Sequence, residues 1–114
     1  MADCLFCSII QGKSKGAIVY RDDEVVAFHD IRPEAPVHIL IVPRKHIPSL
    51  SSLEPGDVPV LGAIFTAAAK LAKELGVAES GYRVVVNNGA DAGQSVFHLH
   101  YHLLGGRPMG WPPG

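Results

Sequence analysis

His98-Leu99-His100-Tyr101-His102-Leu103-Leu104 is the stretch that decides the fold, because it alternates imidazoles with apolar side chains. Successive side chains of a β-strand point to opposite faces, so the alternation predicts a strand, which we expect over residues 96–104. Leu99, Tyr101 and Leu103 then face the core. The three imidazoles line the other face, about 6.5–7 Å apart along the strand. This strand therefore has one buried face and one face that carries chemistry.

Outward from this strand, the sequence predicts more short strands and one long helix. Apolar residues at three- and four-residue spacing from Val58 to Leu75, Phe65 among them, predict the helix, with Asp57 as its N-cap and Gly76 as its stop. Strands are expected over residues 17–21, 24–29, 38–42 and 82–87, a short helical turn over 4–11, and an irregular tail over 105–114. We therefore expect one α+β domain over residues 1–114, built on an antiparallel sheet of about five strands.

Composition and charge exclude several classes of protein. The 114 residues carry 10 basic and 11 acidic side chains, so phosphate neutralisation on nucleic acid and a polybasic membrane anchor are both disfavoured. Hydrophobic residues make up 47% and charged residues 18%, which indicates a folded core. The start, Met1 to Cys4, has neither a basic nor an apolar segment of a secretory signal, so we expect a cytoplasmic protein.

Three imidazoles in a row suit either of two chemistries. Histidine is the commonest metal ligand, and it is also a nucleophile toward phosphorus with neighbours that can donate hydrogen bonds. The spacing alone leaves both open. The loop from Asn87 to Ser95 favours an anion, because it offers glycines, amides and a hydroxyl but no thiolate.

The chain resembles the histidine triad (HIT) superfamily, through the His-φ-His-φ-His-φ-φ pattern of residues 98–104. Within that superfamily it is most similar to the nucleotide-binding (HINT) branch, and the resemblance covers almost the whole chain. The further segments that carry it are Phe28-His29-Asp30-Ile31, Pro36-Val37-His38, Val42-Pro43-Arg44-Lys45-His46-Ile47, Gly93-Gln94-Ser95, Gly105-Gly106-Arg107-Pro108-Met109 and Trp111-Pro112-Pro113-Gly114.

The resemblance implies a homodimer, with the sheet extended across it, that binds purine nucleoside monophosphates. It implies hydrolysis of nucleoside phosphoramidates and acyl-adenylates, with no cofactor required for catalysis. His100 would attack phosphorus and form a nucleotidyl-histidine that water then resolves. Its other ring nitrogen would donate to the carbonyl of His98, which fixes the tautomer.

The resemblance also implies roles for other side chains. His102 would contact the phosphate or leaving group, His38 would support it, and Ser95 would donate to the leaving atom or a phosphoryl oxygen. His38 could equally be a strand-end histidine, and Asp30, the expected ribose acceptor, could be only an Asx-turn residue. The remaining nucleotide contacts expected are Phe28, Ile31 and Ile10 around the base, Asn87, Gly93 and Gln94 at the phosphate, and Trp111 reaching toward the partner's site.

The cysteines depart from the animal members of this branch, which generally lack them. Cys4 and Cys7 form a C-x-x-C that resembles the zinc-carrying members of the superfamily. That likeness implies a structural zinc held by Cys4, Cys7, His46 and His98. The alternative is two free thiols.

Two other functions stay open on the sequence. The protein could be a nucleotide sensor or scaffold with incidental hydrolysis. It could also hydrolyse dinucleoside polyphosphates, although the Gly105–Gly114 tail favours the HINT branch.

Overall fold

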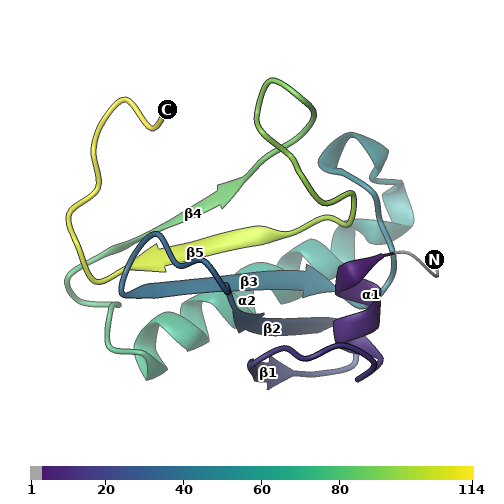
Figure 1. Ribbon diagram of the computed structural model, residues 1–114, viewed down its shortest axis with the longest axis horizontal. Coiled ribbons are helices and arrows are strands. Elements are labelled where there is room, and N and C mark those ends of the chain that lie inside the picture. Colours follow the sequence, from purple (N-terminus) through teal and green to yellow (C-terminus); the bar gives the residue numbers. More distant parts are fainter. Residues whose placement is uncertain (1–3) are drawn as a thin grey trace.

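A five-stranded antiparallel sheet forms the body of the protein in the computed structural model, which describes residues 4–114 (Figure 1). The strand order is β1-β2-β3-β5-β4, so β3 is central and β1 and β4 are the edges. The sheet thus has the predicted class and strand number. The strands are β1 (Ile18–Arg21), β2 (Val25–His29), β3 (Val37–Pro43), β4 (Tyr82–Val86) and β5 (Tyr101–Gly105); the helices are α1 (Leu5–Ile10) and α2 (Val58–Glu74), with 3₁₀ turns at Leu50–Ser52 and Pro55–Asp57.

Each face of the sheet buries its own apolar cluster, because strand residues alternate between the faces. On one face α2 covers the larger cluster, which includes Ile39, Ile41 and Leu103. On the other face α1 packs its Phe6, Ile9 and Ile10 against alternate residues of β2 and β3. Figure 1 shows the two helices on opposite sides of the strands. The strand β3 is covered on both faces, as its almost wholly apolar sequence indicates.

The alternation in residues 98–104 is confirmed, but the predicted strand over 96–104 begins too early. Leu99, Tyr101 and Leu103 all join the cluster under α2, as expected. Regular pairing starts only at Tyr101, where β5 meets both β3 and β4. Residues 96–100 lie outside the regular strand, and the Leu99 N–H donates to the Ile47 carbonyl at 2.6 Å.

The long helix is confirmed, and Asp57 occupies its N-cap position as predicted. The Asp57 carboxylate nevertheless makes no cap bond to α2. It accepts from the Glu54 N–H and from Lys45 Nζ, so it closes the 3₁₀ turn before the helix. Phe65, expected on the apolar stripe, lies half exposed, and its ring meets that of Tyr101 edge-on with centroids 5.4 Å apart.

No helix among the described residues is long and apolar enough to cross a membrane. The tail after Gly105 has no helix or strand, as predicted. Residues Met1–Asp3, used above for the signal-peptide argument, lie outside the described residues. Extension of the sheet by a second copy, and the domain limits at 1 and 114, stay predictions.

Candidate functional site

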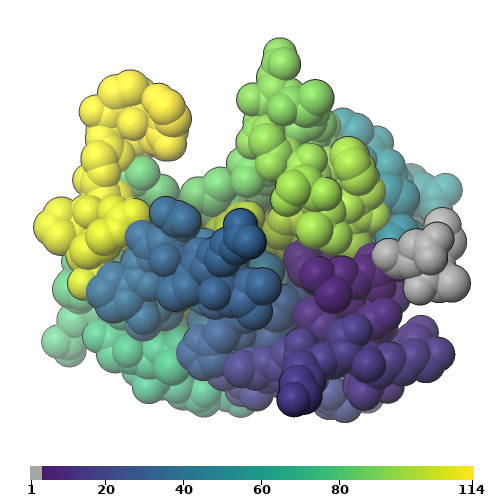
Figure 2. All heavy atoms as spheres, in the orientation of Figure 1, coloured from purple at the N-terminus to yellow at the C-terminus, as the bar shows by residue number. Residues whose placement is uncertain are grey.

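A pocket of about 320 Å³ opens on the α1 face of the sheet. In Figure 2 its three walls meet where α1 (purple), the segment after β2 (blue) and the loop before β5 (light green) come together. Side chains from four separate segments line it: Leu5, Phe6, Ile9, Lys15, Gly16, Phe28, His29, Asp30, Ile31, Leu40, Ser95, Val96, His100 and His102. The lining is largely apolar with polar groups gathered near the histidines, which is typical of a small-molecule site.

His100 has one ring nitrogen engaged and one free. Its Nδ1 lies 2.7 Å from the carbonyl oxygen of His98. Since a carbonyl only accepts, Nδ1 carries a proton, and in the neutral ring Nε2 keeps a lone pair. The ring is buried, and Phe6 packs edge-on against it with centroids 5.1 Å apart. The free nitrogen therefore belongs to a ring held in one orientation at the pocket.

His38 and His102 form a second hydrogen-bonded unit beside His100. The Glu34 N–H donates to His38 Nδ1 at 3.0 Å, so a neutral His38 carries its proton on Nε2. That Nε2 lies 2.9 Å from His102 Nδ1 and 3.4 Å from Asp30 Oδ2. His102 Nδ1 accordingly accepts, and the proton of a neutral His102 sits on Nε2. A donor and a lone pair thus stand on neighbouring rings, whose centroids are 5.2 Å apart.

Burial decides the charge of His102. Desolvation, aided by the nearby imidazoles of His100 and His38, lowers the pKa of His102 from 6.5 to about 4. Asp30 opposes this shift only weakly. His102 is therefore neutral at pH 7 in the pocket described here.

Most of the nucleotide contacts expected around the base and the histidines line this pocket. Phe28, Asp30, Ile31 and Ser95 do so together with His100 and His102. The alternative for Asp30 is also present, since its Oδ1 accepts from the Arg32 N–H at 2.8 Å and forms an Asx turn. Asp30 can form the Asx turn through Oδ1 and still accept from a ligand through Oδ2, because the turn does not use Oδ2.

Five expected contacts lie elsewhere in the chain. Ile10 packs into the core cluster under α1, and Ile9 lines the pocket in its place. Asn87 lines a second hollow, on the far side of His102. The Gln94 amide fastens its own loop, donating to the Pro48 and Val96 carbonyls and accepting from Gly89, and neither Gly93 nor Gln94 is in the wall. Trp111 is exposed and lies beside Arg83.

Sequence reasoning missed several wall residues. Leu5, Phe6 and Ile9 all come from α1, and Leu40 and Val96 complete the apolar lining. In the sequence Phe6 and Leu40 look like ordinary core residues. Their apolar character alone therefore did not distinguish a pocket wall from the core. His29 and Lys15 also border the pocket.

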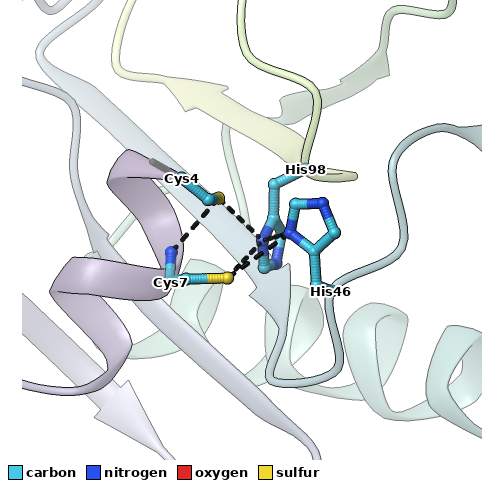
Figure 3. Close-up of side chains that lie close together, drawn as sticks. All are labelled: Cys4, Cys7, His46 and His98. Atoms are coloured by element: carbon cyan, nitrogen blue, oxygen red, sulfur yellow. Dashed lines mark hydrogen bonds between the residues drawn. The ribbon is translucent and has the colours of Figure 1, made fainter. Parts of the chain in front are cut away.

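Cys4, Cys7, His46 and His98 converge at the start of α1 (Figure 3). The two sulfurs point from α1 toward two imidazoles that come from the segments after β3 and before β5. Cys4 Sγ lies 3.4 Å from His98 Nδ1, and Cys7 Sγ lies 3.4 Å from His46 Nδ1 and 3.6 Å from His98 Nδ1. The two Nδ1 atoms are 3.2 Å apart.

These spacings fit a metal ion. Ligands of a tetrahedral zinc with Zn–S of about 2.3 Å and Zn–N of about 2.05 Å are separated by about 3.3–3.8 Å. His98 Nε2 donates to the Pro43 carbonyl at 2.8 Å, so its Nδ1 presents a lone pair to the sulfurs. Burial lowers the pKa of His98 to about 4 and keeps the ring neutral, as a ligand must be. The four side chains could therefore hold a metal ion.

Asp30, His38 and His102 also lie close enough together to be considered as metal ligands. The 2.9 Å between His38 Nε2 and His102 Nδ1 is shorter than the separation of about 3.3 Å between two nitrogens on one zinc. A hydrogen bond explains that distance fully. We therefore attribute the short distance to a hydrogen bond between the two imidazoles and not to metal ligation.

Comparisons with known proteins agree with this architecture. A family model described as the HIT domain matches residues 11–109. The purine nucleoside phosphoramidase of Escherichia coli K12 is 46% identical over 108 residues, covering 95% of this chain and 91% of that protein. The crystal structure of a HIT family hydrolase from Legionella pneumophila Philadelphia 1 has a TM-score of 0.96 at 48% identity, covering 98% of this chain and 100% of that one.

A further solved structure is similar over most of the chain. A Zn-bound histidine triad family protein from Mycobacterium smegmatis has a TM-score of 0.80 at 31% identity, covering 93% of this chain and 76% of that one. The match of the HIT domain model to most of the chain, together with these relatives, shows the family directly. This protein belongs to the HIT domain family.

Proposed function

We propose that this protein hydrolyses purine nucleoside phosphoramidates and acyl-adenylates through a nucleotidyl-histidine intermediate on His100. The observation that carries the proposal is the 2.7 Å hydrogen bond from His100 Nδ1 to the His98 carbonyl, which leaves Nε2 free at the pocket. The similarity to a purine nucleoside phosphoramidase supports the reaction class.

The reaction divides one difficult displacement into two easier ones. His100 Nε2 attacks phosphorus, a new P–N bond forms, and the bond from phosphorus to the leaving amine breaks. A water molecule then attacks the phosphorus of the nucleotidyl-histidine, releases the nucleoside monophosphate and restores His100. Ser95 lies in the pocket wall with a hydroxyl that can donate to a phosphoryl oxygen or to the leaving atom.

His102 supplies the proton that an amine needs in order to leave. Its Nε2–H is directed away from His38, which occupies its Nδ1. The negative charge of a bound phosphoryl group raises the proton affinity of the ring and favours the imidazolium. The imidazolium gives its Nε2 proton to the amine and becomes neutral, and in the second step the neutral ring takes a proton from the attacking water. His38, fixed by the Glu34 N–H, holds His102 in the orientation that this transfer requires.

The nucleoside lies against the apolar part of the pocket in this proposal. Phe28 and Ile31 contact the base, with Ile9 in the place first given to Ile10. Asp30 Oδ2 accepts from the ribose hydroxyls. Asn87 faces the second hollow across His102, and it is thus assigned to the leaving-group side and not to the nucleoside side.

The metal held by Cys4, Cys7, His46 and His98 is zinc in this proposal. The choice rests on two thiolates and two imidazoles, a closed donor set preferred by structural zinc. The Zn-bound relative of known structure supports it. When bound, zinc fixes the fold around the start of α1, and the chemical step itself uses only protein side chains.

We also propose a cytoplasmic homodimer. The strand β4 is an edge of the sheet and can pair with a second copy, and Trp111 and Phe65 are exposed large apolar side chains that an interface would cover. Sedimentation is the direct measurement. A monomer at micromolar concentration would remove Trp111 from the site of a partner.

Hydrolysis of adenosine 5′-phosphoramidate is the experiment that tests the proposed reaction. We expect release of AMP with ordinary enzymatic turnover, and trapping of a nucleotidyl adduct on His100 by rapid quench in alkaline denaturant, in which the P–N bond of the adduct survives. Guanosine 5′-phosphoramidate and an acyl-adenylate extend the test to the other substrates.

The same assay decides between the alternatives. AMP binding with negligible turnover on all three substrates would favour a nucleotide sensor or scaffold. Faster cleavage of a dinucleoside polyphosphate than of the phosphoramidate would favour that other hydrolase class. Turnover without any covalent adduct would reject His100 as the nucleophile.

A further inference from the structure

His98 belongs to the group of four candidate metal ligands and also contacts His100, the proposed nucleophile. The ring of His98 directs Nδ1 at the two cysteines, while the main-chain carbonyl of His98 accepts the hydrogen bond that orients His100. The ring is completely buried and its Nε2 is fixed by the Pro43 carbonyl. Any displacement of this ring therefore moves the carbonyl that sets the tautomer of His100.

The helix α1 is a second connection between the two sites. Its N-cap is Cys4, whose Sγ accepts from the Cys7 N–H, so both cysteines belong to its first turn. The same helix supplies Leu5, Phe6 and Ile9 to the pocket wall. A helix of six residues has little stability of its own, so its position depends on what anchors it.

Phe6 joins the two connections. It lies in the chain between the cysteines, and its ring contacts His98, His100 and Phe28 edge-on, with centroids 6.0, 5.1 and 5.4 Å apart. The ring is 4% exposed. A metal ion held by Cys4, Cys7 and His98 would therefore also hold Phe6 in the pocket wall.

We propose that the Cys4–Cys7–His46–His98 site positions the nucleotide pocket, so that binding of a soft divalent cation and binding of a nucleoside monophosphate strengthen each other. The cysteines act as positioning residues through α1 and His98 and touch no substrate. This inference rests on the nucleotide binding proposed above. Linkage requires that each ligand change the affinity of the other by the same factor, for which we expect about tenfold.

The first test measures the Kd of AMP for zinc-loaded protein, for chelator-treated protein and for Cys4→Ser. Serine is a good N-cap, so this variant removes a metal ligand and preserves the cap of α1. We expect AMP to bind about tenfold more weakly to both metal-poor forms. Leu71→Ala is the matched control, because Leu71 lies under the opposite face of the sheet and its loss lowers stability without touching α1. Its AMP affinity should match that of the wild type.

The second test reverses the direction and needs no metal-free protein. Competition with a chromophoric chelator should show that saturating AMP tightens zinc binding by the same factor. In protein loaded with Co²⁺, AMP should shift the visible absorption bands of the ion. This measurement remains decisive even where the metal-free chain fails to fold.

Three results would overturn the inference. Equal AMP affinity of folded metal-loaded and metal-poor protein, with a Co²⁺ spectrum unchanged by AMP, would overturn it and leave the proposed hydrolase intact. The same loss of affinity in Leu71→Ala as in Cys4→Ser would reduce the effect to general stability. Absence of AMP binding to every form would overturn both the inference and the proposed function.

Discussion

The four candidate metal ligands and the proposed reaction site around His100 both use histidines of residues 98–102. These histidines present opposite ring nitrogens. His98 bonds a carbonyl through Nε2 and directs a bare Nδ1 at two sulfurs. His100, two residues later, bonds a carbonyl through Nδ1 and directs a bare Nε2 at the pocket. In each ring, the position of the backbone carbonyl that accepts from it thus decides which nitrogen is left for the role proposed for that imidazole.

Replacement of His100 is the most severe way to break this comparison. His100→Ala should lower kcat on adenosine 5′-phosphoramidate by about 10⁴-fold or more, because the nucleophile is lost. Steady-state kinetics and intact-protein mass spectrometry measure the rate and the missing adduct. AMP binding and the melting temperature should stay near wild-type values, which separates lost chemistry from lost structure. Substantial residual turnover would contradict the assignment.

Removal of the metal should affect stability in the first place. We expect a chelator to lower the free energy of unfolding by about 3 kcal/mol, since the ion ties α1 to two loops. For a chain of this size that corresponds to a fall in Tm of about 10–15 °C, measurable by circular dichroism. In Cys7→Ser the chelator should cause no further fall. A chelator effect that persists in this variant would place the metal elsewhere.

His38 provides a sharper test of the reaction site. The His38→Ala change removes the donor to His102 Nδ1 at 2.9 Å and frees that ring to rotate. A lost orienting hydrogen bond of about 1.5–3 kcal/mol corresponds to a fall in kcat of about 10–100-fold. The amide of His38→Gln can still donate and should recover part of the rate. Equal rates for the two variants would show that His38 only fills space.

The sequence predicted those features that depend on the periodicity of side chains. Alternation placed Leu99, Tyr101 and Leu103 in the core because a strand has period two, and that held even where residues 98–100 left the regular sheet. The family resemblance selected the cluster of Cys4, Cys7, His46 and His98 as metal ligands, and the structure brings these four together.

Features set by rotation and by long-range packing were not predictable. Whether Ile9 or Ile10 lines the pocket depends on the rotation of a six-residue helix, which its thiol cap and its packing fix. Gln94 carries an amide that could donate to a phosphate. In the structure this amide donates to the carbonyls of Pro48 and Val96 instead, and Pro48 lies far away in the sequence. Composition of a loop indicates which groups are present and not which partners they find.

We expect the smallest effect in the pH dependence of stability. It is measured on the wild type and on a variant in which an uncharged side chain replaces His102. Burial lowers the pKa of His102 to about 4 in the folded protein, against 6.5 in the unfolded chain. The unfolded state therefore binds more protons between these values, and the free energy of unfolding falls as pH falls from about 6.5 to 4. Since the ring is partly screened by solvent, we expect a share of about 1–2 kcal/mol. Urea unfolding of wild type and His102→Gln across this range measures it: the wild-type curve should be steeper, at constant metal loading. Parallel curves would show that the ring titrates as freely in the fold as in water, and that the neutral donor inferred for this site is not enforced by burial.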